Sequence, residues 1–327
     1  MNRVVNARSR KKRSTRQAWA EPRWHQAGVN LYPSERALFE AELGRVIREH
    51  SIVGHVPDRP LLDATDDVIT LGSCFAGELT TFLKRAGFLS RRIFMPEGLN
   101  TTYAMLDFIS WCVTGEATGD GFRYERLESG DIREWLPQRK RETYAASIAE
   151  AGVFVLTIGL AEVWQDRETG GVFWHGIPEE IFDPDRHVFR LTTVEENADN
   201  VRRIVELVRQ VNADAPIVLT LSPVPLKGTF RELACMSADC VSKSVLRVAI
   251  DQVMTEAPRG VYYWPSFEIV RWAGAHFSWP AYGLDDDKAR HVSRRLVAEI
   301  VDAFVESFYT PEAVSALQVI RPGVPPD

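Results

Sequence analysis

Short apolar runs alternate with amphipathic stretches along most of the chain. The runs stop at small or polar residues and predict buried strands at positions 68–71, 89–95, 153–159, 216–221 and 261–264. Between them, apolar residues recur at spacings of three and four, which predicts helices at 75–86, 101–111, 194–211 and 238–256 and a last long helix from about 291. This order predicts an α/β fold with about five mostly parallel strands and helices on both faces of the sheet.

Both ends of the chain and two internal stretches fall outside the alternation. We expect a main domain over residues 61–310, preceded by a disordered basic tail over 1–17 and a lead-in segment over 18–60, and followed by a C-terminal tail over 311–327. Within the lead-in segment, Ser34 is a candidate N-cap for a helix that extends to about His50. Residues 115–150 predict polar helical insertions, and 164–184 predict a loop rich in Trp, Gly and Pro.

Charge is unevenly distributed along the 327 residues. The net charge is −6, but the first sixteen residues hold seven basic side chains and no acidic one. The remainder carries 32 basic and 45 acidic residues, a net charge of −13. Phosphate contacts need clustered Lys and Arg, so this composition speaks against a nucleic-acid partner for the body of the protein.

The sequence shows no targeting segment and no metal-binding motif. The basic start is not followed by an apolar segment and no run of eighteen apolar residues occurs, so we expect neither a secretory signal nor a membrane span. The four cysteines, at positions 74, 112, 235 and 240, show no CxxC spacing, and the histidines show no common ligand spacing. We therefore expect no metal and no organic cofactor, and a cytoplasmic location with reduced thiols. The oligomeric state is not indicated.

Chemistry-bearing residues follow the predicted strands. Right-handed crossovers bring the carboxyl ends of parallel strands to one edge, where open α/β sheets bind ligands. The segments expected at that edge are 72–74, 96–100, 159–164, 222–225 and, before the last helix, 285–291. Polar residues and glycines from distant parts of the chain should therefore meet there.

One of these segments, Leu71-Gly72-Ser73-Cys74-Phe75-Ala76, resembles the signature of the GSCFA domain family. Further matches follow in order at positions 98–101, 159–164, 222–225, 242–244 and 290–292, so the resemblance covers roughly residues 60–310. It implies a branch of the SGNH or GDSL hydrolases. Their fold is a three-layer α/β/α sandwich around a five-stranded parallel sheet with a flavodoxin-like strand order.

Ser73 is the candidate nucleophile. A serine at a strand-to-helix turn exposes its hydroxyl at the positive end of a helix, and Gly72 permits the tight turn. The plainer interpretation is an N-cap serine, which is common at helix starts. Cys74 could itself attack as a thiolate, but we expect a small side chain packed beneath the turn.

His291 is the candidate base. The SGNH pattern places an acid three residues before its histidine, where this chain has Lys288, so Asp287 is the preferred partner, followed by Asp286 and Asp285. The mechanism needs an acceptor that fixes the imidazole tautomer. The alternatives are a histidine that merely caps the helix and a solvated acidic turn at its start.

The oxyanion hole departs from the family pattern. The resemblance assigns its donors to the N–H groups of Ser73 and Gly98 and to an asparagine, but the third position holds Glu162. An ionised carboxylate accepts hydrogen bonds and cannot donate them. Four explanations stay open: the Asn100 side chain replaces the donor, Glu162 is protonated, Glu162 binds something else, or the hydrolase mechanism is altered.

Four further residues are candidates for the substrate cleft. Trp164 and Trp174 could stack on a sugar ring, with core packing as the alternative. His175 could line the cleft or be peripheral. Lys243, expected near a helix start where the dipole disfavours a cation, hints at an acidic partner such as Glu162, or it is an exposed lysine.

These residues predict a serine-dependent acyl-ester hydrolase, with an acetyl esterase or acyltransferase acting on carbohydrate as the favoured variant. The expected partner is a small-molecule or carbohydrate ester. The alternative is a non-catalytic protein that binds a glycan or small molecule on a degenerate SGNH fold, with Glu162 as the sign of the lost oxyanion hole.

Overall fold

Five parallel strands form the central sheet of the computed structural model, which describes residues 30–93, 100–116, 124–126, 129–134, 138–174 and 176–320. Their order is β2-β1-β5-β8-β9, and every neighbouring pair is parallel. The strands are β1 Val68–Gly72, β2 Ser90–Arg92, β5 Val153–Ile158, β8 Ile217–Leu221 and β9 Val261–Trp264. The predicted α/β fold, with a five-stranded parallel sheet in flavodoxin-like order, is confirmed.

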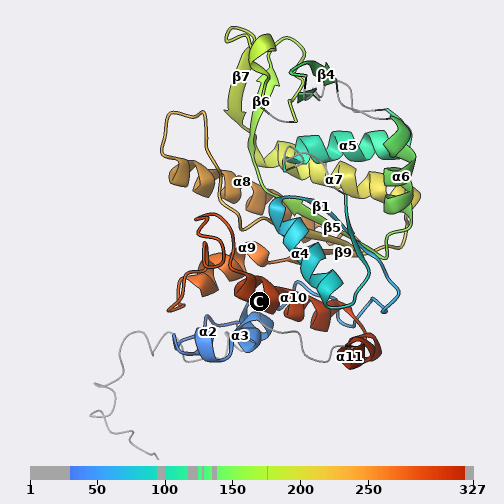
Figure 1. The fold of residues 1–327 in the computed structure, drawn as a ribbon, viewed down its shortest axis with the longest axis vertical. Coiled ribbons are helices and arrows are strands. Elements are labelled where there is room, and N and C mark those ends of the chain that lie inside the picture. Colours follow the sequence, from blue (N-terminus) through green and yellow to red (C-terminus); the bar gives the residue numbers. More distant parts are fainter. Residues whose placement is uncertain are drawn as a thin grey trace, which may run out of the picture.

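Helices cover both faces of this sheet (Figure 1). One face is packed by α5 Thr102–Thr114, α6 Gln138–Ala149, α7 Val194–Val211 and α8 Cys235–Thr255. The other is packed by α3 Leu43–His50, α4 Cys74–Arg85 and α10 Arg294–Phe308, together with residues 269–273, which follow the short helix α9 Ser266–Glu268. Successive strand residues supply the two cores in turn: Phe154 and Leu156 face α5 and α7, whereas Val153 and Val155 face α4 and α10.

Capping side chains fix where several helices begin. Thr193 and Glu196 form a capping box at the start of α7, where each side chain binds the other's backbone N–H. Thr101 caps α5 and Ser293 caps α10. The last helix therefore starts after His291 and leaves that residue in the preceding loop.

Two antiparallel hairpins extend beyond the central sheet. They are β3 Tyr124–Arg126 with β4 Ile132–Glu134, and β6 Glu162–Asp166 with β7 His187–Leu191. The sequence did not reveal either hairpin. Helical insertions were expected over 115–150, where α6 does form, and a loop was expected over 164–184, most of which connects β6 to β7. Each of these strands is short, and polar residues interrupt its apolar positions. Neither the two-residue period of a strand nor the 3.6-residue period of a helix is therefore evident in the sequence.

The segments outside the main alternation also hold helices. The predicted helix from Ser34 is divided into α2 Leu38–Ala41 and α3, and Phe39, Val46 and Ile47 are buried against the face that carries α10. Residues 311–320, placed in a C-terminal tail by the sequence, form α11 Pro311–Ile320. The remaining short elements are η3 Glu179–Ile181 and η4 Ile269–Ala273. In the described part of the chain, every helix is too short or too polar to cross a lipid bilayer.

Candidate active site

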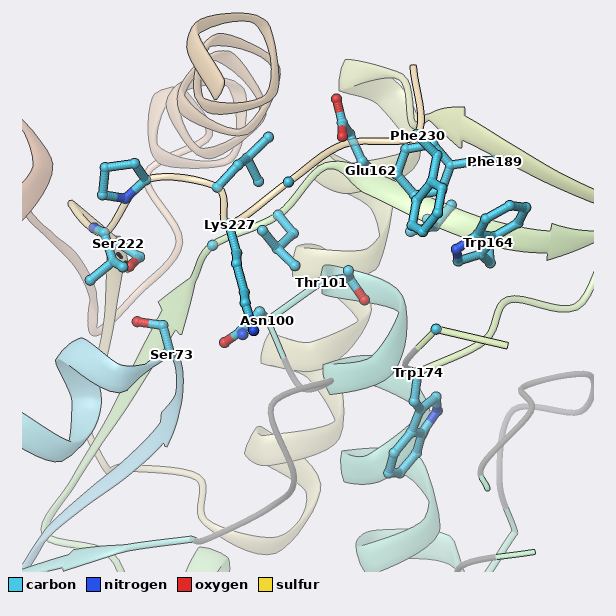
Figure 2. A pocket seen from close by; sticks show the side chains of 18 of the residues that line it. Ser73, Asn100, Thr101, Glu162, Trp164, Trp174, Phe189, Ser222, Lys227 and Phe230 are labelled. Carbon is cyan, nitrogen blue, oxygen red and sulfur yellow. Dashed lines mark hydrogen bonds between the residues drawn. The ribbon is translucent and has the colours of Figure 1, made fainter. Parts of the chain in front are cut away.

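The carboxyl ends of β1, β5 and β8 surround one cavity of about 290 Å³. Ser73 follows β1, Gly159 follows β5, Ser222 follows β8, and Asn100 precedes α5; all four line the cavity (Figure 2). The edge that the strand order predicted therefore brings these residues together.

Ser73 occupies the turn from β1 into α4. Its Oγ accepts a hydrogen bond from the Phe75 N–H at 3.2 Å, so Ser73 also caps α4. The serine is 6% exposed and faces the cavity. Its own N–H donates to the carbonyl oxygen of Thr157 at 3.3 Å, so this proposed oxyanion donor already has an acceptor.

Gly72 allows two strands to approach at the turn. Its φ is +118°, and a Cβ there would lie 2.1 Å from the Thr157 carbonyl oxygen. The glycine therefore accommodates the backbone of β5. Cys74, expected beneath the turn, is instead exposed and lines the cavity.

Arg92, at the end of β2, holds the same turn from the other side. Its guanidinium donates to the carbonyl oxygens of Gly72 at 3.2 Å and Ser73 at 3.3 Å. The sequence analysis missed this residue. A basic side chain at the carboxyl end of a buried parallel strand is the signal that could have found it.

Asn100 connects the entrance of α5 to the end of β5. Its carbonyl oxygen accepts from the N–H groups of Gly159 at 2.8 Å and Leu160 at 2.9 Å, while its half-buried side chain lies in the cavity. Gly98 and His175, the two other residues predicted for this region, lie outside the described residues.

Glu162 is the first residue of β6 and a wall of the cavity. It is 6% exposed, and its Oε1 accepts from the Arg231 guanidinium at 3.2 Å. Its Oε2 is buried and has no hydrogen-bond partner among the described residues. Arg231, which the sequence analysis missed, therefore balances the charge of Glu162, and the second carboxylate oxygen is buried.

Lys243 lies beneath the cavity, with 1% of its surface exposed. It stands eight residues inside α8, so the expected position at a helix start was wrong. Its Nζ donates to the Gly159 carbonyl oxygen at 2.8 Å, and Glu162 pairs with Arg231 instead. Burial lowers the pKa of the Lys243 amine to about 7.

His291 lies in the loop before α10. Its Nδ1 is 2.6 Å from Oδ2 of Asp286, so the carboxylate that meets the imidazole belongs to Asp286. Asp287, the preferred partner from the sequence, has φ +58° and donates its N–H to the Gly283 carbonyl oxygen. Burial raises the pKa of the Asp286 carboxyl, but hydrogen bonds from the Lys288 N–H and His291 outweigh it and hold the pKa below its ordinary value.

The loop that carries His291 is tied to the edge of the cavity. The Tyr282 hydroxyl donates to the Pro223 carbonyl oxygen at 2.9 Å, and Arg290 donates to the Pro225 carbonyl oxygen at 3.3 Å. Arg290 itself lines the cavity, whereas the His291 side chain is 45% exposed and forms no hydrogen bond with Ser73. His291 therefore follows a lining residue in the chain but is not itself among the residues that line the cavity.

Aromatic side chains form the wall opposite Ser73. Trp164 meets Phe189 and Phe230 edge to face, with ring centroids 5.1 Å and 5.0 Å apart (Figure 2). Phe230 is 72% exposed. Trp174 also lines the cavity, but it is nearly buried and its Nε1 donates to Asp107 at 2.8 Å. Trp164 and Phe230 therefore offer apolar surface to a ligand, and Trp174 also packs in the core.

Comparison with known proteins adds a family match. The sequence profile of the GSCFA family matches residues 67–304. No curated protein matches the chain.

Several solved structures resemble the fold at low identity. A putative GDSL-like lipase from Parabacteroides merdae is 13% identical, with 76% of this chain and 98% of that chain covered and a TM-score of 0.43. A family two carbohydrate esterase from Cellvibrio japonicus is 12% identical, with coverage of 80% and 64% and a TM-score of 0.34. The salicylyl-acyltransferase SsfX3 from a tetracycline biosynthetic pathway is 12% identical, with a TM-score of 0.40. The match covers 78% of this chain but only 56% of that one.

Proposed function

Because the chain belongs to the GSCFA family, we propose that it is a serine-dependent acyl-ester hydrolase or acyltransferase with Ser73 as the nucleophile. The observation that carries the proposal is the position of Ser73 at the β1–α4 turn, where it lines a cavity that Arg290 also lines. The residue after Arg290 is His291, which pairs with Asp286. A serine needs a base to remove its proton before it attacks an ester carbonyl.

His291 is the proposed base. The Asp286 carboxylate at Nδ1 favours the tautomer that carries its proton there, which leaves the Nε2 lone pair to accept a proton. In the reaction, Ser73 Oγ releases its bond to the Phe75 N–H and attacks the carbonyl while Nε2 takes the proton. The protonated imidazole then returns that proton to the leaving alcohol, and the acyl group passes to water or a second alcohol.

The oxyanion is proposed to bind to the Ser73 and Gly98 N–H groups and the Asn100 side chain. The first of these donates to Thr157 in the resting site, so it must be shared or released as charge develops. An ionised carboxylate is not a donor, and Glu162 accepts from Arg231 through Oε1. We assign Glu162 to the substrate-binding wall of the cavity, where it holds the Arg231 guanidinium in place.

The proposed substrate class is an acylated carbohydrate. The aromatic faces of Trp164 and Phe230, which line the cavity, suit the apolar face of a sugar ring. Cys74 and Cys240 are exposed free thiols, which fits the proposed cytoplasmic location because that compartment keeps thiols reduced.

Hydrolysis of 4-nitrophenyl acetate and of acetylated sugars by wild type and Ser73→Ala tests the function. We expect release of acetate by wild type and a loss of roughly 1,000-fold or more in the variant. Equal activity of the two proteins overturns the assignment of Ser73.

A binding protein without turnover is the second candidate, and Glu162 in place of an oxyanion donor is the observation that favours it. Glu162→Asn distinguishes the two. A fall in esterase activity is expected, because Arg231 loses its charged partner in the cavity wall. A glycan that binds to wild type with no turnover of its acetate ester would favour the binding protein.

A further inference from the structure

The cavity carries charge of the opposite sign to the rest of the molecule. Outside its basic start, the protein has a net charge of −13, yet Lys227 and Arg290 line the cavity beside Ser73. Glu162 is the one acidic residue among the described lining residues, and Arg231 already pairs with it. The cavity therefore presents two positive charges that the site does not neutralise.

Lys227 is the more exposed of the two. It belongs to the loop between β8 and α8, and its side chain extends toward Asn100 in the view of Figure 2. Among the described residues it has no ion-pair partner. A solvated ammonium on a flexible stem costs little to leave unpaired, so it is available to an incoming anion.

Arg290 is half-buried and held in place. One of its amino groups donates to the Pro225 carbonyl oxygen at 3.3 Å, and no carboxylate of the described chain reaches its guanidinium. Arg48 and Arg202, by contrast, are paired with Glu306 and Glu256. The guanidinium of Arg290 is therefore available to an anion in the cavity.

A buried amine and the N-terminus of a helix lie next to the cavity. The buried Lys243 amine lies against the Gly159 carbonyl oxygen, and burial lowers its pKa, with the charges of Arg271 and Arg290 acting in the same direction and Asp239 against them. The N-terminus of α4, with its partial positive charge, opens at Ser73.

We propose that the substrate of this cavity carries an anionic group, a carboxylate or a phosphate or sulfate monoester, which Lys227 and Arg290 hold while the ester carbonyl lies at Ser73. The ester part of this statement rests on the proposed function; the anion selectivity does not. Lys227 and Arg290 are then specificity-determining residues, because a neutral ester of the same shape gains nothing from their charges.

Calorimetric titration of 4-hydroxybenzoate and 4-hydroxybenzamide, which differ in charge and little in shape, tests the selectivity without any need for turnover. Wild type should bind the anion about ten-fold more tightly than the amide, and added salt should reduce the difference. Lys227→Gln and Arg290→Gln should each remove most of it. The control is Lys84→Gln, at the far end of α4, which should keep the preference.

Equal affinity for the two ligands, no binding of either up to roughly 10 mM, or a preference that survives in both cavity variants overturns the proposal. Phenyl phosphate in the same titration shows which anion the pair prefers.

The acetyl esters of the same two compounds separate this inference from the proposed function. We expect a higher kcat/KM for 4-acetoxybenzoate than for 4-acetoxybenzamide, with the ratio reduced by Lys227→Gln. Turnover of both esters at the same rate overturns the anion selectivity and leaves the hydrolase. Selective binding of the anion with no turnover of either ester overturns the hydrolase and leaves the anion site.

Discussion

The carboxylate that pairs with His291 was predicted in kind but not in position. The sequence placed an acidic turn before the last helix but preferred Asp287, because a count along the chain cannot detect a tight loop. In the structure the left-handed backbone of Asp287 directs its N–H to Gly283, and the Asp286 carboxylate reaches Nδ1 of His291. The residue proposed to orient His291 is therefore Asp286 and not Asp287.

Asp286→Asn should lower kcat/KM by about 10–100-fold, because the imidazole loses the carboxylate that fixes its tautomer. The loss should be smaller than in a buried triad, since 33% of this side chain is exposed to screening solvent. Asp287→Asn is the matched control, as asparagine tolerates the left-handed conformation. A larger loss in the control than in Asp286→Asn would contradict the assignment.

Because the Lys243 amine is buried, we predict that the free energy of unfolding depends on pH. Its pKa is about 7 in the folded protein, lowered by burial from an ordinary value of 10.5. Between these values the unfolded chain binds more protons than the folded one, so the free energy of unfolding rises with pH from about 7 to 10 and is level below 7 with respect to this group.

Lys243→Met removes that titration together with the hydrogen bond to Gly159. Urea unfolding at several pH values should therefore show wild type gaining stability relative to the variant as pH rises from about 7 to 10. A difference that does not change with pH would contradict the buried, poorly solvated state of this amine.

At the scale of elements, strongly periodic segments could be predicted and short interrupted ones could not. The strand at 261–264 and helix α7 have the predicted bounds, because a buried strand and a long apolar stripe leave clear patterns. The β6–β7 hairpin was missed, since about twenty residues separate two strands of mixed polarity. That hairpin supplies Glu162, Trp164 and Phe189 to the cavity wall; the sequence indicated the first two as candidates but not the strand pairing that positions them.

Gly72 joins strand β1 to the turn that leads into α4, and this turn requires a glycine. Gly72→Ala should cost about 3 kcal/mol of unfolding free energy, because φ is +118° and the new Cβ would meet the β5 backbone. Gly54→Ala, at φ +79° with open space around it, should cost only about 1 kcal/mol. Similar losses in the two variants, measured by urea unfolding, would show that the contact with β5 is not what constrains the turn.

At the scale of the whole molecule, the parallel sheet explains why distant segments form one site. All five strands point the same way, so Ser73, Asn100, Gly159 and Ser222 reach one edge although they span 150 positions of the chain. The topology was predictable from the alternation of strands and helices. The partners of Glu162 and Lys243 were not, because they depend on how helix α8 and its preceding loop pack across that edge.

The most direct test of the account is intact-mass analysis after treatment with a fluorophosphonate, from which an activated serine displaces fluoride. We predict one adduct on wild type and none on Ser73→Ala, with both proteins folded by circular dichroism. An unlabelled wild type, or a variant labelled as fully as wild type, would contradict the assignment of Ser73 as the nucleophile.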